Sequence, residues 1–269
     1  MRIRGSVAVV TGASSGIGWE TALLLARKGA LVRAVARSED DLDRLAGTHP
    51  NITSHVADLA DPEQRASLAR SAGDVDILVN NAGLGWTGLV EDMPAERVRL
   101  LFEVNVMALV DLTQQVLPGM LERKQGRVVN VASVVSWVSA PPFTMYAATK
   151  FAVQGFSEGL RREVAGRGVA VSTVNPGPIA TKFWVRSNGE DRPSQHLIGD
   201  LKTGLPPSFA ARAVLRAVRL GAFPGYGTIA VPRFLGLARL AAVPGLRLVV
   251  NAGSLVSRQP TVWRAMQGD

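Results

Sequence analysis

Two side chains that could exchange a proton lie four residues apart, Tyr146 and Lys150, in the segment TMYAATK. In a helix, residues with this spacing share one face, so the lysine ammonium would lie close to the phenol. A tyrosine alone has a pKa of about 10 and is a poor acid or base at neutral pH. Because a nearby cation favours the phenolate, we expect Lys150 to lower the pKa of Tyr146 toward the range that general acid–base catalysis requires.

A hydroxyl group that could complete such a site belongs to Ser133, at the end of the strand-like run RVVNV over residues 127–131. From there it could hydrogen-bond an oxygen atom that the phenol protonates. Tyr and Lys at helical spacing are usually just surface neighbours, so the pair gains weight only from the elements around it.

A glycine-rich turn near the N-terminus is the first of these elements. The apolar run of residues 5–11 is followed by TGASSGIG over residues 11–18, and then by a helical pattern over residues 19–28. In such a strand–turn–helix unit, glycines let backbone N–H groups approach a pyrophosphate at the helix N-terminus. The spacing is T-G-x-x-x-G-x-G rather than G-x-G-x-x-G. Glycine turns also simply join strands to helices, so this motif alone is modest evidence.

The end of the second expected strand, residues 31–36, bears on the choice of cofactor. An acidic residue there binds the ribose 2′-hydroxyl of NAD, whereas an arginine accommodates the 2′-phosphate of NADP. Ala36 occupies the acid's position and Arg37 follows it. The sequence therefore favours NADP(H) over NAD(H), with a solvated arginine at a strand end as the alternative.

Short apolar strands alternate with helical patterns along the rest of the chain. We expect further strands at residues 52–57, 75–79, 127–131, 169–174 and 226–231, and helices at residues 39–45, from 62, 95–123, 146–166 and 208–220. This alternation predicts an α/β fold, a Rossmann-type doubly wound parallel sheet with helices on both faces. The motif residues all follow strand ends, at the carboxyl edge where open α/β sheets bind ligands.

Asn105 lies in the middle of the helix expected at residues 95–123. Asparagine is a poor residue for a helix interior because its side chain competes for backbone hydrogen bonds. We therefore expect either a bend in the helix at this position or a role for Asn105 in the site.

The composition excludes several kinds of site. The 269-residue chain has 47% hydrophobic and 19% charged residues, as a packed globular protein does. It has no cysteine, which excludes disulfides, thiol catalysis and thiolate metal ligands. The three histidines are scattered, so no metal site is expected. The opening MRIRGSVAVVTG is too short and too quickly polar for a signal peptide, and a cytoplasmic location is expected.

These motifs, in this order and spacing, resemble those of the short-chain dehydrogenase/reductase family over about residues 5–182. The resemblance rests on TGASSGIG, Asp58, NNAG at residues 80–83, Asn105, Ser133, YAATK at residues 146–150 and PGPIAT at residues 176–181. It implies an NAD(P)-dependent oxidoreductase that interconverts a ketone or aldehyde and an alcohol. The sequence ARS at residues 36–38 resembles the NADP-preferring members.

The resemblance also implies a role for each of four catalytic residues. Tyr146 would be the general acid or base, Lys150 would lower its pKa and hold the nicotinamide ribose, and Ser133 would orient the substrate oxygen. Asn105 would position a water molecule that links Lys150 to solvent.

The same resemblance implies which residues bind the cofactor. Asp58 would contact the adenine, Asn81 the ribose side, and Ile179 with Thr181 the carboxamide. Together the expected cofactor-binding residues are Gly12, Ser14, Ser15, Gly16, Ile17, Gly18, Arg37, Ser38, Asp58, Leu59, Asn81, Ala82, Gly83, Tyr146, Lys150, Pro176, Gly177, Ile179 and Thr181.

Residues 182–207 follow the last motif, and from this position we expect them to form a lid over the pocket. They include Phe183 and Trp184, which suggest a lipophilic substrate such as a steroid, retinoid-like or fatty-chain carbonyl. A core-packing role for Trp184 explains that residue equally well.

The net charge of +8 arises in the C-terminal part, because residues 192–269 hold ten Lys or Arg and two acids. We expect residues 1–269 to form one domain, with a core at residues 5–231 and a C-terminal helical extension at residues 232–269. That extension has no run of about 18 to 20 apolar residues that could span a membrane. Its apolar, arginine-bearing helices could instead cover the pocket or form a dimer contact, which we favour, or lie at a membrane surface.

The expected partners are a small carbonyl or alcohol substrate and a second copy of the chain, with a dimer favoured. We expect no nucleic-acid binding, because the C-terminal arginines are spaced among apolar residues rather than clustered. An alternative hypothesis keeps the fold but makes the protein an NADP(H)-binding regulator or scaffold without turnover. Against it, every catalytic position carries the required type of residue.

Overall fold

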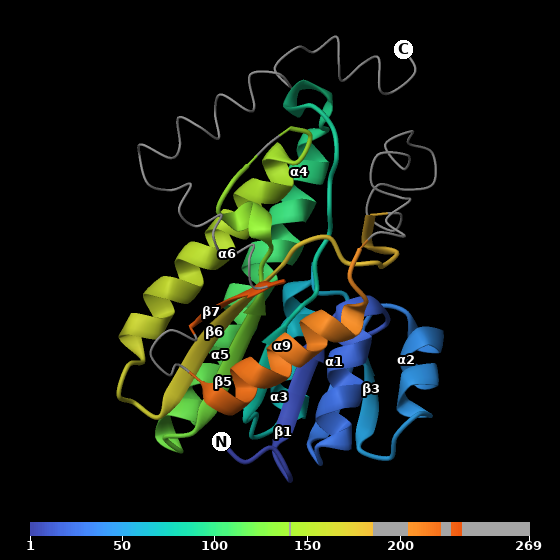
Figure 1. The fold of residues 1–269 in the computed structure, drawn as a ribbon. Helices are drawn as coiled ribbons and strands as arrows, with labels where there is room; N and C mark the ends of the chain where they lie inside the picture. Colours follow the sequence, from blue (N-terminus) through green and yellow to red (C-terminus); the bar gives the residue numbers. More distant parts are fainter. Residues whose placement is uncertain (140, 185–203, 222–226, 233–269) are drawn as a thin grey trace.

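Seven parallel strands form one sheet in this protein (Figure 1). The computed structural model describes residues 1–139, 141–184, 204–221 and 227–232. The strand order is β3-β2-β1-β4-β5-β6-β7. The chain builds outward from β1 in one direction and then from β4 in the other, which leaves a crevice at the carboxyl ends of these two strands. The predicted doubly wound α/β fold is confirmed.

The strands and helices follow the expected order. The strands are β1 (Val7–Thr11), β2 (Leu31–Ala36), β3 (Ile52–Val56), β4 (Ile77–Asn80), β5 (Gly126–Val131), β6 (Val169–Pro176) and β7 (Thr228–Val231). The helices described are α1 (Gly16–Arg27), α2 (Glu39–Ala46), α3 (Pro62–Ala72), α4 (Ala95–Phe102), α5 (Ala108–Glu122), α6 (Thr144–Glu163) and α9 (Pro207–Leu220), with short 3₁₀ turns at Val90–Asp92 and Val134–Ser136.

Several predicted boundaries differ from the structure by two or three residues, and two of the differences have a clear local reason. Helix α1 begins at Gly16 rather than residue 19, because Gly16 and Gly18 of the glycine-rich segment already belong to the first turn of the helix. Strand β4 begins at Ile77 rather than residue 75. The carboxylate of Asp76 accepts a hydrogen bond from the Val7 N–H at 3.0 Å. A side chain therefore takes the place of a backbone acceptor at this end of the β1–β4 pairing.

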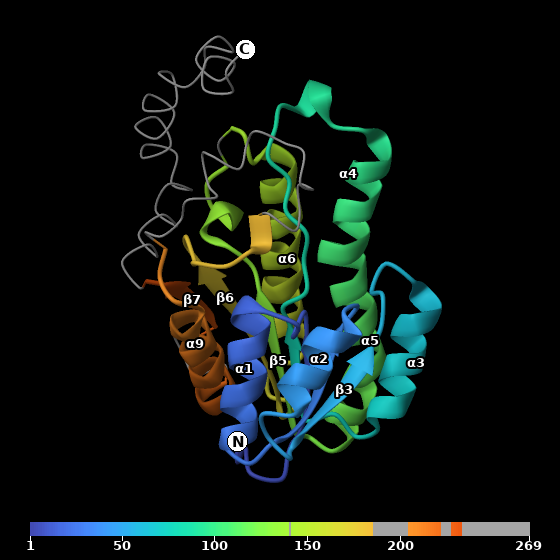
Figure 2. The same cartoon turned by 90° about the vertical axis from the view of Figure 1, so that its right-hand side faces the viewer.

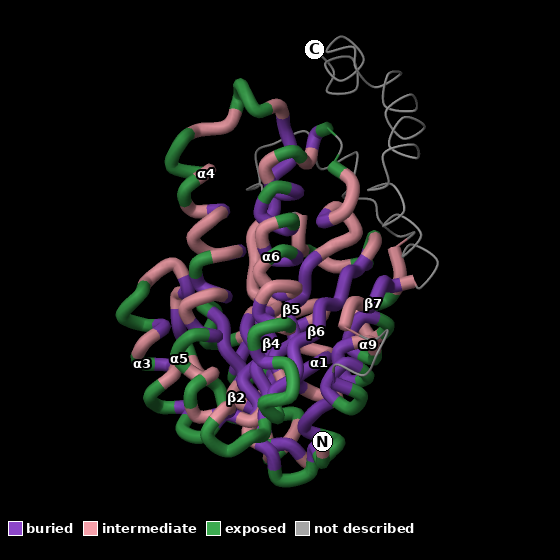
Figure 3. The backbone as a smooth tube through the Cα atoms, turned by 90° about the vertical axis from the view of Figure 1, so that its left-hand side faces the viewer, coloured by how far each residue is buried: buried purple, intermediate pink, exposed green. Residues whose placement is uncertain are grey.

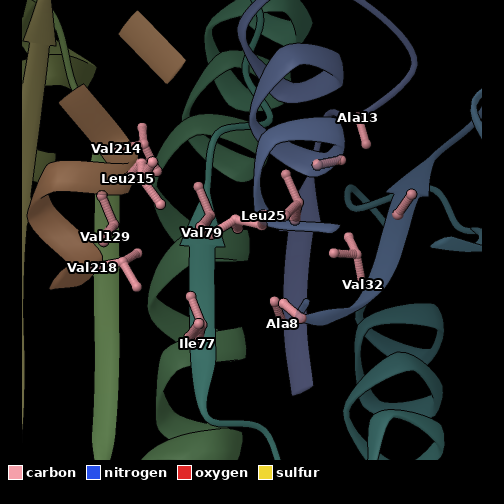
Figure 4. Close-up of a cluster of buried hydrophobic side chains, with 14 of the residues drawn as sticks. Ala8, Ala13, Leu25, Val32, Ile77, Val79, Val129, Val214, Leu215 and Val218 are labelled. Atoms are coloured by element: carbon pink, nitrogen blue, oxygen red, sulfur yellow. The ribbon is translucent and has the colours of Figure 1, made fainter. Parts of the chain in front are cut away.

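Helices cover both faces of the sheet. Helices α1, α2 and α9 pack on one face, and α3, α5 and α6 pack on the other (Figure 2). Alternate strand residues point to opposite faces: Ala8 and Val10 of β1 join the first layer, and Val9 joins the second. Figure 4 shows one face of the sheet meeting its helices, at Ala8, Leu25, Val32, Ile77, Val79, Val129, Val214, Leu215 and Val218.

The central strands are buried on both faces, whereas the outer turns of the helices are exposed (Figure 3). Three asparagines nevertheless lie inside the sheet, Asn80, Asn130 and Asn175, and the first two link strands to helices. The Asn80 amide donates to Asn130 Oδ1 at 2.9 Å and to Thr113 Oγ1 at 3.2 Å, and the Asn130 amide donates to Ser157 Oγ at 2.8 Å. These bonds tie α5 and α6 to neighbouring strands, which fixes the helices that carry much of the site.

The run of helix from Ala95 to Glu122 is long and apolar enough to cross a membrane by length and composition. Core helices share this property, and ion pairs hold this one against α3. Arg65, with 4% of its surface exposed, donates to Glu103 at 2.7 Å and to Asp111 at 2.6 Å. We therefore interpret it as a covering helix of the sheet.

Packing of α1 against the sheet predicts a clear effect of truncating Leu25, which is 1% exposed. Leu25→Ala should lower the free energy of unfolding by about 2–5 kcal/mol, because it leaves a cavity between α1 and the sheet. Urea denaturation measures this value. Leu31→Ala, at a residue that is 50% exposed, is the matched control and should cost less than about 1 kcal/mol. Equal losses in the two variants would contradict this account of the core.

Candidate active site

A cavity of about 920 Å³ lies at the carboxyl ends of the strands. This volume is near the upper end of small-molecule sites, at roughly 300–1,000 Å³. All the predicted site residues line it except Gly18 and Asn105. Those that line it are Gly12, Ser14, Ser15, Gly16, Ile17, Arg37, Ser38, Asp58, Leu59, Asn81, Ala82, Gly83, Ser133, Tyr146, Lys150, Pro176, Gly177, Ile179 and Thr181.

The glycine turn forms one wall of this cavity, at the N-terminus of α1. Gly12 and Gly16 have φ angles of 65° and 57°, which L side chains rarely adopt. A Cβ on Gly16 would lie 2.9 Å from Thr181 Cγ2, and one on Gly18 would lie 2.1 Å from the Gly12 carbonyl oxygen. Gly18 therefore permits close packing behind the wall. No acidic residue occupies the first turn of α1, so the helix end suits a pyrophosphate.

Thr11 and Asn81 hold this turn against the loop that follows β4. The Thr11 hydroxyl accepts hydrogen bonds from the backbone N–H groups of Asn81 and Ala82, both at 3.0 Å. The Asn81 side chain donates to the Thr11 carbonyl at 2.9 Å. The motifs at residues 11–18 and 80–83 are therefore one rigid unit across the switch point.

The far end of the cavity carries charged side chains. Arg37 is exposed and lines the cavity, and it has no hydrogen-bond or ion-pair partner among the residues that the structure describes. Asp41 also lines this end but is paired with Arg44. Asp58, which follows the neighbouring strand β3, also lines the cavity and accepts from the Ala60 N–H at 3.0 Å. Arg37 is therefore the cation available there to an anionic group such as a 2′-phosphate.

Tyr146 and Lys150 lie at the other end, on the first turns of α6. Lys150 Nζ is 5.7 Å from the centre of the Tyr146 ring and donates to the Val131 carbonyl at the end of β5, at 3.1 Å. The Ser133 hydroxyl donates to the Pro176 carbonyl and accepts from the Val135 N–H, both at the long distance of 3.4 Å, and it also hydrogen-bonds Tyr146. The predicted catalytic residues of β5 and α6 are brought together here.

The expected effect of Lys150 on the phenol was wrong for this structure. Tyr146 is 7% exposed, and burial raises its pKa well above the usual value, although a hydrogen bond with Ser133 acts in the opposite direction. Burial also lowers the pKa of Lys150 to about 8. Loss of water therefore outweighs the attraction between the two groups, and at neutral pH the phenol keeps its proton and the ammonium stays charged.

Asn105 lies behind this site, in a π-helical turn at Glu103–Met107 between α4 and α5. Its amide donates to the Leu84 carbonyl at 2.9 Å and to Thr149 Oγ1 at 3.0 Å, and its oxygen accepts from the Leu84 N–H at 2.7 Å. The helix distortion expected at Asn105 is confirmed. The π turn re-aims the side chain so that it joins the loop after β4 to α6, beside Lys150. Its role in positioning a water molecule stays a prediction.

Three aromatic side chains outside the sequence motifs lie near Tyr146: two contact its ring, and the third contacts one of those two. Trp184 lies 5.1 Å from the Tyr146 ring and 5.3 Å from the Phe143 ring between centroids, and Phe183 lies 5.9 Å from Tyr146. We call Phe143, Phe183 and Trp184 the aromatic cap. Phe183 and Trp184 belong to the predicted lid, of which residues 185–203 lie outside the described residues.

Both ends of the predicted lid segment lie within the described residues, and backbone hydrogen bonds hold them together. Leu205 pairs with Ile179 in an isolated parallel bridge. The Leu205 N–H donates to the Pro178 carbonyl at 3.1 Å, and its carbonyl accepts from the Ala180 N–H at 3.0 Å. The segment from residue 182 to residue 204 therefore begins and ends beside the carboxyl edge of β6.

Sequence reasoning did not assign several apolar residues of the cavity wall to the site. They are Leu84, Val104, Val134, Val135, Phe143 and Pro178. Most stand within two residues of a motif, so proximity to the motifs was the available signal. Phe143 also needed the path of the chain, which only the fold supplies.

The fold and the site define a dinucleotide-binding α/β oxidoreductase. A family model for short chain dehydrogenases matches residues 6–192. The chain belongs to the short-chain dehydrogenase/reductase family, and the resemblance seen in the motifs is confirmed.

Individual relatives agree with this assignment. The chain is 40% identical over 200 residues to the 3-oxoacyl-[acyl-carrier-protein] reductase of Vibrio cholerae, which covers 71% of this chain and 81% of the relative. A short-chain dehydrogenase from Burkholderia cenocepacia, solved in complex with NADP, has a TM-score of 0.78 at 28% identity and covers 95% of this chain and 99% of that one. One from Burkholderia phymatum, in complex with NAD, has a TM-score of 0.81 at 27% identity and covers 90% and 94%. A nicotinamide cofactor is thereby supported, but not a preference between its two forms.

The buried Lys150 predicts a particular dependence of stability on pH. Between its lowered pKa of about 8 and the ordinary value near 10.5, the unfolded chain binds a proton that the folded chain has released. The free energy of unfolding should therefore rise by about 1 kcal/mol per pH unit from pH 8 to 10 on account of this group.

Urea denaturation of the wild type and of Lys150→Met at pH 7, 8, 9 and 10 measures this contribution. Other titrating groups contribute alike to both proteins, so the difference between the two slopes isolates Lys150. The wild-type slope should exceed that of the variant between pH 8 and 10. Parallel curves would show that Lys150 keeps an ordinary pKa in the folded protein.

Proposed function

We propose that this protein is an NADP(H)-dependent reductase or dehydrogenase that interconverts a lipophilic ketone or aldehyde and the corresponding alcohol, with Tyr146 as general acid and base. The observation that carries the proposal is one continuous cavity, with a glycine turn and Arg37 at one end and Tyr146, Lys150 and Ser133 at the other. A dinucleotide along its length would bring its reactive ring to the tyrosine.

The residues present fit such a cofactor. The N-terminus of α1, with Gly12 and Gly16, would hold the pyrophosphate, and Ile179 with Thr181 would lie beside the carboxamide. The bound cofactor would supply a hydride to the carbonyl carbon during reduction. Every other step would belong to side chains of the chain itself.

Tyr146 would donate its phenolic proton to the carbonyl oxygen as that oxygen gains negative charge. Its raised pKa keeps the proton in place at neutral pH until a stronger base develops beside it. Lys150, charged below its pKa of about 8, would stabilise the phenolate that remains. Ser133, whose hydroxyl already lies within hydrogen-bond reach of Tyr146, would hydrogen-bond the same oxygen.

A lipophilic substrate is supported by the distribution of charge in the cavity wall. Arg37, Asp41 and Asp58 all lie at the cofactor end, and Lys150 is the one charged side chain that the described wall contributes near Tyr146. Apart from the Ser133 hydroxyl and the Tyr146 phenol, the described wall there is mostly aliphatic and aromatic. The Vibrio cholerae relative is named for a 3-oxoacyl chain, which is a ketone in an apolar setting and supports the same substrate class.

The preference for NADP(H) rests on Arg37, which lacks a partner within the described part of the chain and lines the end where a 2′-phosphate would lie. A cytoplasmic location, a single domain and a homodimer are part of the proposal. The C-terminal extension and its membrane or dimer contact fall on residues 233–269, outside the described residues.

Replacing the phenol tests the reaction directly. Tyr146→Phe should reduce kcat by about 10²–10⁴-fold, because it removes the proton donor and leaves the ring and its packing in place. NADPH oxidation by purified protein is measured with a panel of small and lipophilic carbonyl compounds, with NADPH affinity determined in parallel. NADPH should still bind to the variant. Wild-type turnover in Tyr146→Phe would rule out the mechanism, and NADPH binding without any turnover in the wild type would favour the regulator hypothesis.

Replacing Arg37 tests the cofactor preference. Arg37→Ala should weaken NADPH binding by about 10- to 100-fold, because charge-assisted hydrogen bonds to the 2′-phosphate are lost. The affinity for NADH, which lacks that phosphate, should change less than about threefold on the same reasoning. Arg70→Ala, at an exposed arginine of α3 away from the cavity, is the control. Equal losses for NADPH and NADH would show that Arg37 does not read the phosphate.

A further inference from the structure

Two rings of the aromatic cap, Phe183 and Trp184, pack against the proposed proton donor Tyr146. Trp184 contacts Tyr146 edge to face, with the rings inclined at 72°, and packs on Phe183 at 5.0 Å between centroids. Phe143, which precedes the first turn of α6, contacts the indole from another side. All three cap residues also line the cavity. The indole ring of Trp184 is therefore a central part of the wall in the substrate half of the cavity.

Gly85 makes this arrangement possible. A Cβ on Gly85 would lie 2.6 Å from Trp184 Cζ3 and 2.9 Å from Phe183 Cε1, closer than side-chain atoms approach one another. Its φ angle is not in the left-handed region, so the backbone there accepts any L residue. Gly85 has no side chain, and this leaves the space that the Phe183 and Trp184 rings occupy beside the loop after β4.

We propose that Trp184, seated against Gly85, is the specificity-determining residue of this site and selects uncharged ketones or aldehydes that carry a flat ring next to the carbonyl carbon. This inference rests on the proposed function and narrows its substrate class. Within the lipophilic carbonyls, it chooses flat ring compounds over fatty-chain compounds.

Two physical arguments favour a ring. Aromatic faces and edges attract other flat rings in defined geometries, by more than the apolar area they bury. A flexible alkyl chain gains no such contact and loses more conformational freedom when it is ordered. The charge distribution supports the other half of the inference, an uncharged substrate, because the described wall around the cap offers an anion no cation except Lys150.

The test compares two methyl ketones with the same number of carbon atoms, 2-acetylnaphthalene, which is flat, and 2-dodecanone, which is an alkyl chain. Their dissociation constants are measured in the NADPH complex of Tyr146→Phe, where no turnover interferes, from the change in NADPH fluorescence. Turnover of both ketones is measured separately in proteins with Tyr146 intact. Binding selectivity and catalysis are thus separate readouts.

Four substitutions are compared in both backgrounds. Trp184→Ala removes the indole, and Gly85→Ala displaces it without changing any residue of the cap. Trp184→Phe keeps a flat ring, and Gly155→Ala is the matched control on α6, where an added Cβ meets no atom within 4 Å. Unchanged NADPH affinity in each variant reports that the fold and the cofactor half are intact.

In the protein without these substitutions, we expect 2-acetylnaphthalene to bind more tightly than 2-dodecanone. That preference should fall about tenfold in Trp184→Ala and in Gly85→Ala, and should be largely kept in Trp184→Phe and Gly155→Ala. The inference is overturned if 2-dodecanone binds as tightly, if neither ketone binds, or if Trp184→Ala keeps the full preference. A merely structural role for Trp184 would weaken both ketones alike.

The proposed function can fail separately. Selective binding of the naphthyl ketone that depends on Trp184, without turnover of any carbonyl compound, would refute the reductase and leave the specificity assignment standing. Turnover of carbonyl compounds without that selectivity would support the reductase and refute the specificity assignment to Trp184.

Discussion

The hydrogen bond from Lys150 to the Val131 carbonyl is the contact on which the site depends. It places a buried ammonium between the end of β5 and the first turns of α6, and an ammonium in such a place must have a partner. Tyr146 lies one turn earlier on the same helix, so fixing Lys150 also fixes the phenol. The same burial raises the pKa of the phenol and lowers that of the amine, which keeps the proton on Tyr146 at neutral pH.

Polar side chains behind the cavity hold this arrangement in place. Asn105 joins the loop after β4 to Thr149, next to Lys150, while Asn80 and Asn130 tie α5 and α6 to the strands. Each of these buried amides would be costly without partners, so the network favours one arrangement of α5, α6 and the sheet. A reactive tyrosine can therefore stand on a helix and still be placed accurately.

The cavity is divided into a charged half and an apolar half. Backbone N–H groups, glycines and Arg37 occupy one end, which suits phosphates, whereas the aromatic cap encloses the other. Enclosure by apolar rings removes water from the phenol and strengthens the electrostatic effect of Lys150.

The fold class and most of the cavity-lining residues followed from the sequence alone, because the order of strands and the motifs at their ends are local patterns. Carboxyl ends of parallel strands must meet at one edge, so residues as distant as Gly12 and Tyr146 could be placed together without coordinates. The π turn at Asn105, the seat of Trp184 against Gly85 and the raised pKa of Tyr146 could not. They depend on which side chains exclude water and on a few ångströms of space between segments far apart in the chain, and only tertiary packing decides these.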